Sequence, residues 1–152
     1  MRILSTAVGI LLLTLTVRAG DAATDAKKLQ GNWEVTELIA YGEKVDPKLF
    51  KGTKFIFKAD KLTIVPGDPK GDVFVGRTIA VKLDPTKKPA AVDLTVLDGK
   101  DKGIVSPGVY AIDGDTLRWC QPDGSKTKER PKELASPVKS DLYLITLSRA
   151  KK

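Results

Sequence analysis

Histidine is absent from the 152 residues, and Cys120 is the only cysteine. Without histidine the chain cannot carry a Ser-His-Asp or Cys-His nucleophile, and with one cysteine it lacks the ligands of a conventional zinc site. A single cysteine also excludes an intramolecular disulfide. Cys120 lies in a strand-like run, Thr116 to Gln121, where we expect a packing role and an inert thiol. These absences predict no catalytic residue, no metal site and no enzymatic activity.

Aromatic residues make up only 6% of the chain, and glycine-rich nucleotide motifs are missing. A phosphate loop or a dinucleotide fingerprint needs a strand-to-helix junction, so we expect no nucleotide and no other cofactor. The net charge of +7 could suggest a nucleic acid partner. The lysines are interleaved with aspartates, however, and aromatic residues for stacking are few, which favours a solvated surface and no nucleic acid.

Two weak motifs are better explained by local structure. Ser136 to Lys139 matches Ser-x-x-Lys, but that enzyme motif places its serine and lysine one helical turn apart and needs further partner motifs that this chain lacks. The pairs Asp98 with Asp101 and Asp113 with Asp115 offer too few oxygen ligands for a calcium loop. Aspartates at such positions are typical of turns.

One long apolar run is present, from Ile3 to Val17 after Arg2, and small residues follow it from Ala19 to Ala23. This order indicates a secretory signal peptide, residues 1–22. The run is shorter than the roughly 20 residues that a membrane-spanning helix needs, so we expect cleavage after Ala22, or alternatively after Ala19. An uncleaved signal anchor is the other interpretation.

The signal peptide predicts that the protein is exported, to the periplasm or the extracellular space. No cysteine follows the apolar run, so a lipid anchor is not expected, and the cleaved protein has no stable membrane anchor. Removing the leader takes away Arg2, Arg18 and Asp21 and leaves a net charge of +6. Residues 23–152 are enough for one domain that folds without disulfides or metal.

Short apolar runs separated by glycine and proline predict an all-β domain. A helical turn from Ala26 to Leu29, capped by Thr24 or Asp25, precedes the first strand. In that strand the apolar residues change face between Val35 and Leu38, which a β-bulge would explain. A turn over 46–50 follows, where Leu49 and Phe50 are placed to plug an open end. The remaining expected strands are 54–58, 62–65, 73–83, 92–96, 109–112, 116–120 and 142–147.

Consecutive hairpins without a helical crossover favour an up-and-down antiparallel β-barrel of about eight strands. The turns Ala59-Asp60-Lys61 and Asp113-Gly114-Asp115 each join two strands of a hairpin. The last strand is apolar on both faces, which favours closure because closure removes exposed edges. A two-sheet β-sandwich is the alternative.

The segment Gly31-Asn32-Trp33 resembles the Gly-x-Trp start of lipocalin-type barrels. In that superfamily the tryptophan closes the base of the barrel, and an arginine after the last strand packs over it. Arg149 is in the corresponding place. The resemblance implies a structural latch of Gly31, Trp33 and Arg149, worth about 0.5 to 2 kcal/mol for a guanidinium on an indole face.

The order of segments also resembles an uncharacterised lipocalin-like family of exported proteins, known mainly from planctomycete bacteria. That resemblance brings no known activity. The segments that carry it are Leu29 to Trp33, Lys82 to Pro89, Gly108 to Tyr110, Asp113 to Leu117, Arg130-Pro131 and Leu147 to Arg149.

Two functions are consistent with an exported barrel of this kind. The first is a carrier that holds a small apolar or amphipathic ligand inside the barrel. The candidate lining residues are Phe55, Phe57, Tyr110, Arg118, Trp119 and Tyr143, although strand alternation cannot place all of them inside. The second is a non-catalytic structural or interaction module of the cell envelope, in which a lysine-rich stretch from Lys126 to Lys132 meets an anionic envelope component. An internal cavity of about 300 Å³ or more would favour the carrier.

Overall fold

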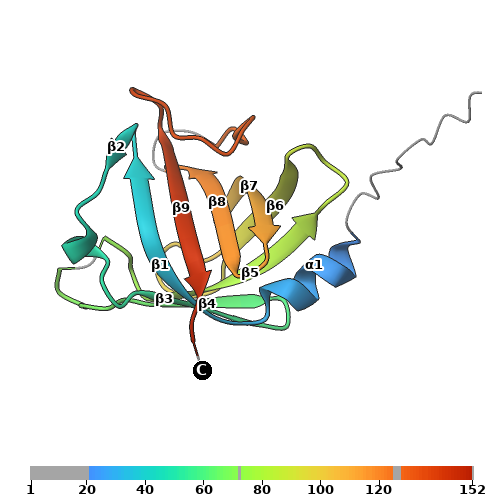
Figure 1. Cartoon of the computed structure of the whole chain (residues 1–152), viewed down its shortest axis with the longest axis horizontal. Coiled ribbons are helices and arrows are strands. Elements are labelled where there is room, and N and C mark those ends of the chain that lie inside the picture. Colours follow the sequence, from blue (N-terminus) through green and yellow to red (C-terminus); the bar gives the residue numbers. More distant parts are fainter. Residues whose placement is uncertain (1–20, 72, 125–127, 152) are drawn as a thin grey trace, which may run out of the picture.

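The computed structural model describes residues 21–71, 73–124 and 128–151, which form an antiparallel β-barrel with one helix beside it (Figure 1). The predicted signal peptide, up to residue 20, lies outside the described residues. The elements are α1 (Ala22–Leu29), β1 (Gly31–Ala40), β2 (Glu43–Lys44), the 3-10 turn η1 (Pro47–Leu49), β3 (Lys54–Lys58), β4 (Lys61–Val65), β5 (Arg77–Asp84), β6 (Ala90–Val96), β7 (Val105–Asp113), β8 (Thr116–Pro122) and β9 (Leu142–Arg149).

Eight strands form a closed barrel in the order β1-β3-β4-β5-β6-β7-β8-β9. The last strand returns to the first, with pairs running from Trp33 with Arg149 to Ala40 with Tyr143. In Figure 1, β9 lies directly beside β1. The short β2 adds to the end of β1 outside this ring. The predicted up-and-down barrel is therefore confirmed, and the sandwich alternative does not form.

The predicted bulge in β1 is confirmed. The register between β1 and β9 shifts between Val35 and Glu37. An extra residue at this point turns the following side chains by one position, so that Leu38 faces the interior as Trp33 and Val35 do. The strand β1 can therefore bury its apolar residues both before and after the bulge.

The N-terminal helix is longer than the single turn expected from the sequence. It begins at Ala22, and the side chain of Asp21 caps it by accepting a hydrogen bond from the N–H of Ala23. Thr24 and Asp25, the expected caps, lie inside the helix because the alanines before them continue it. Its Leu29 is buried against the end of the barrel.

The expected long strand from 73 to 83 is wrong in its first part, because β5 begins only at Arg77. Its neighbour β4 ends at Val65, before Pro66 and Gly67, so residues 73–76 have no strand to pair with. They form a loop instead, in which Phe74 packs edge-to-face on Phe55 at 5.5 Å between ring centroids.

Residues 128–141, before β9, form no strand and cover part of the outer face of the barrel. Under them lies a second buried cluster of Val109, Cys120 and Leu144, with Leu134 packed against it. The Cys120 thiol donates to the carbonyl of Ala135, and its burial raises its pKa to about 11. The thiol is thus held protonated at neutral pH.

Candidate functional site

The barrel is filled at one end and hollow at the other. A cavity of about 660 Å³ occupies the half away from α1. Its walls are mostly apolar and come from every strand of the barrel. The apolar lining residues are Leu38, Ala40, Val45, Phe55, Leu62, Ile64, Val73, Phe74, Val75, Ile79, Leu94, Val96, Ile104, Trp119, Pro122 and Ile145.

The filled half begins below Trp119. The ring of Phe57 lies 6.2 Å from that of Trp119, and the fully buried Trp33, Leu117 and Leu147 continue the packing toward α1. None of these four deeper residues lines the cavity. The cavity therefore has a packed floor, and described residues of the β1–β3, β4–β5, β6–β7 and β8–β9 connections line its other end.

The six candidate lining residues separate into three groups. Phe55, Trp119 and Tyr143 line the cavity. Phe57 and Tyr110 also face the interior, but they belong to its filled half. Arg118 lies on the outer face, where its guanidinium donates to the carbonyl of Leu134, because its neighbour Trp119 takes the inward position.

A hydrogen-bonded cluster of two tyrosines and a carboxylate lies at the mouth. The hydroxyl of Tyr41 donates to Oδ2 of Asp123 at 2.6 Å, and Tyr143 contacts the same oxygen at 3.2 Å. The two rings pack at 5.2 Å between centroids. The hydrogen bond to Asp123 is the main cause of a raised pKa at Tyr41, so its phenol remains a donor at neutral pH.

Tyr41 has an unusual backbone conformation, with φ of 55°, and its N–H donates to the carbonyl of Leu142 at 3.1 Å. The adjacent Gly42 also has a positive φ, and a Cβ there would lie 2.4 Å from the backbone of Val138. Ser136 accepts from the N–H of Gly42 and donates to the carbonyl of Leu142. The hydroxyl of the Ser-x-x-Lys motif is thus used to fix this turn.

Four further polar residues line the cavity: Arg77, Asp101, Ser106 and Gln121. The buried Oγ of Ser106, on β7, has no hydrogen-bond partner within the described part of the chain. On the rim, Arg77 and Asp101 form an ion pair at 3.6 Å. Sequence reasoning missed Tyr41, Ser106 and Asp123, because each is a single polar residue next to a turn or strand end with no motif around it.

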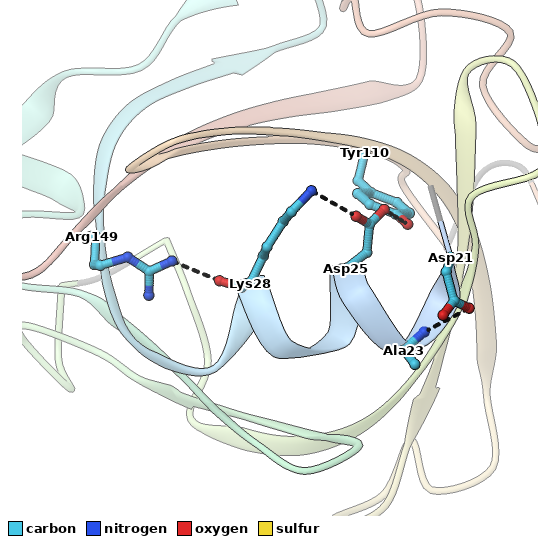
Figure 2. A network of polar contacts seen from close by, with 6 residues as sticks. All are labelled: Asp21, Ala23, Asp25, Lys28, Tyr110 and Arg149. Atoms are coloured by element: carbon cyan, nitrogen blue, oxygen red, sulfur yellow. Dashed lines mark hydrogen bonds and ion pairs between the residues drawn. The ribbon is translucent and has the colours of Figure 1, made fainter. Parts of the chain in front are cut away.

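At the other end of the barrel, Arg149 reaches the C-terminal end of α1 (Figure 2). The guanidinium carbon of Arg149 lies 4.3 Å from the centroid of the Trp33 ring. Arg149 also donates to the carbonyls of Lys28 and Gln30, at the C-terminus of α1, and to Asp115. Cationic groups at a helix C-terminus are favourable, so one side chain ties the helix to the barrel.

Gly31 leads the chain from the helix into β1 with φ of 109°, a conformation that favours glycine. Trp33 donates its ring N–H to the carbonyl of Leu29 at 2.7 Å. Tyr110 reaches α1 as well, donating to Asp25 at 2.8 Å, and burial is the main cause of its raised pKa. These contacts make α1 part of the closed end.

Within the described residues, no group of three or more His, Cys, Asp or Glu side chains is arranged to hold a metal ion. Three of the four aspartates in the two pairs have protein partners: Asp98 accepts from the backbone of Thr78, Asp101 pairs with Arg77, and Asp115 pairs with Arg149. None of the described helices is long and apolar enough to span a membrane.

Fold and site together define an eight-stranded, up-and-down barrel of lipocalin-like architecture with an apolar cavity open at one end. Comparison with protein-family models, with curated proteins and with solved structures finds no significant match.

Proposed function

We propose that this protein is an exported, non-catalytic binding protein that holds one small amphipathic ligand inside its barrel. The observation that carries the proposal is the apolar cavity of about 660 Å³. This volume lies within the range of small-molecule sites, roughly 300 to 1,000 Å³. A purely structural module would be expected to fill its interior, as the half of this barrel next to α1 is filled.

The polar groups give the ligand an orientation. Its apolar body lies against Phe55, Leu62 and Trp119, which are almost fully buried. A hydroxyl or similar group of the ligand bonds to Ser106, whose hydroxyl has no partner among the described residues, a costly state for a buried group. Tyr41, Tyr143 and Asp123 lie at the mouth of the cavity, where they limit which polar groups of a ligand can be accommodated.

The test is a binding assay with an uncharged fluorescent probe, N-phenyl-naphthylamine, competed by a series of long-chain alcohols. An uncharged probe avoids non-specific attraction to the basic surface. We expect saturable binding of one probe per chain and displacement by the alcohols. Native mass spectrometry of protein purified from its source then identifies the bound molecule.

A matched pair of variants locates the binding. Ala40→Phe places a ring in the cavity that Ala40 lines, whereas Ala111→Phe adds the same ring to the exposed outer face of β7. Filling the cavity is expected to weaken probe binding by about tenfold or more, which corresponds to about 1.4 kcal/mol. Equal binding by both variants, or no binding by the unmodified protein, contradicts the proposal and favours an interaction module of the envelope.

A further inference from the structure

A second concave site lies on the outside of the barrel, over β5, β6 and β7. It has a volume of about 500 Å³ and is bounded by the 85–89 turn and by residues 130–132. It shares no lining residue with the barrel cavity. Two segments noted separately in the sequence, Lys82 to Pro89 and Arg130-Pro131, meet here although some 40 residues separate them.

The lining of this outer cleft is strongly basic. Its charged residues are Lys82, Lys87, Lys88, Arg130 and Lys132, against Asp84 and Asp93. Five cations and two carboxylates leave an excess of three positive charges in one concavity. Low-dielectric walls focus such a field, which raises the local concentration of anions.

Both carboxylates of the cleft are already engaged by the protein. Asp93 forms an ion pair with Arg130 at 2.6 Å. Asp84 accepts hydrogen bonds from the backbone and the hydroxyl of Thr86, which with the nearby cations lower its pKa. Among the described residues no ion pair joins Asp84 or Asp93 to a lysine, so the ammonium groups of the cleft remain accessible to a ligand.

Arg130 makes the cleft a defined structure. Its Nη1 donates to the carbonyls of Val92 and Gly108, at 2.9 and 2.7 Å, while Nη2 holds Asp93. Pro131 is buried beside Arg130. One wall is therefore fixed to the sheet, and it sets the position from which Lys132 extends.

We propose that the outer cleft binds a small polyanion, a compound with two or more phosphate or carboxylate groups. Lysines of the 82–88 segment and Lys132 line the same concavity, which suits separate anionic groups on one compact molecule. An extended polymer would need a continuous basic track, whereas this concavity is bounded by the turn and the 130–132 segment. The barrel ligand and the polyanion bind independently.

Isothermal titration with inorganic tripolyphosphate, at low and at physiological salt, tests the site. We expect one tripolyphosphate per chain. Lys87→Gln/Lys88→Gln should weaken binding by about tenfold, because two charge-assisted contacts are lost. The control Lys48→Gln/Lys51→Gln removes the same charge from exposed positions around η1 and should change the affinity by less than about twofold, since distant surface charges are screened.

Chemical shifts provide a second readout that does not depend on the variants. Saturating tripolyphosphate should perturb the backbone amides of residues 84–93 and 130–132 and leave those around the cavity mouth unchanged. Equal loss of affinity in both double variants would show that net charge alone attracts the anion, and the proposal would be overturned. Binding of long polyphosphate without any saturable tripolyphosphate site would overturn it as well.

Discussion

At the scale of single residues, a few side chains connect parts of the chain that are far apart. Arg149 touches the ring of Trp33, the end of α1 and Asp115, and so joins both ends of the chain to one turn. Tyr41 and Asp123 connect two loops at the mouth. The contacts of such residues cannot be predicted from the sequence, because their partners come close only when the barrel closes. Arg149 could be anticipated only through a family resemblance.

The latch is expected to show energetic coupling between Trp33 and Arg149. In a double-mutant cycle of Trp33→Phe and Arg149→Lys, measured by urea unfolding, we expect a coupling of about 0.5 to 2 kcal/mol. The cycle of Trp119→Phe with Arg149→Lys is the control, because Trp119 lies in the cavity wall. A coupling energy near zero between Trp33 and Arg149 would contradict the latch.

At the scale of elements, local pattern was a good guide where both partners of a pair are adjacent in sequence. The hairpins β3–β4 and β7–β8 follow from alternation and from their turns, as expected. The start of β5 could not be derived this way. Alternation continues back to Val73, but a strand also needs a neighbour, and β4 has already ended. Position within the sheet overrides pattern there.

The helix α1 gives a prediction at this scale. Asp21→Ala removes the capping carboxylate and should lower the free energy of unfolding by about 1 kcal/mol, whereas Asp21→Asn keeps a capping side chain and should change it little. Urea unfolding of chains that begin at Gly20 measures the free energy of unfolding of both variants. Equal loss in the two variants would mean that the charge matters and the cap does not. Cleavage after Ala22 would remove this cap, and cleavage after Ala19 would retain it.

At the scale of the whole molecule, the fold was predicted better than the site. Strand number, antiparallel order and closure follow from repeated hairpins and a doubly apolar last strand. The volume of the hollow part depends on the side-chain volumes of all eight strands and on the bulge in β1. A local sequence pattern cannot predict this volume, because it covers only one or two strands. The cavity and its polar mouth therefore required the structure.

Export makes a prediction for the full chain. Produced as residues 1–152 in a bacterium with two membranes, the protein should be released with the periplasmic fraction and should lack its first 22 residues by intact mass. A mature chain beginning at Gly20 would support the alternative cleavage after Ala19. Retention of the full mass in the membrane fraction would instead indicate an uncleaved signal anchor.

The pairing of β1 with β9 has a consequence for the time at which this protein can fold. The seam between Trp33 and Arg149 joins residues from opposite ends of the domain, so its contacts have nearly the greatest sequence separation that the domain permits. Contacts of this kind form slowly. If the chain crosses a membrane from its N-terminus, the partner of β1 is the last strand to arrive. The barrel then stays open throughout passage, and its own topology delays folding until translocation is complete.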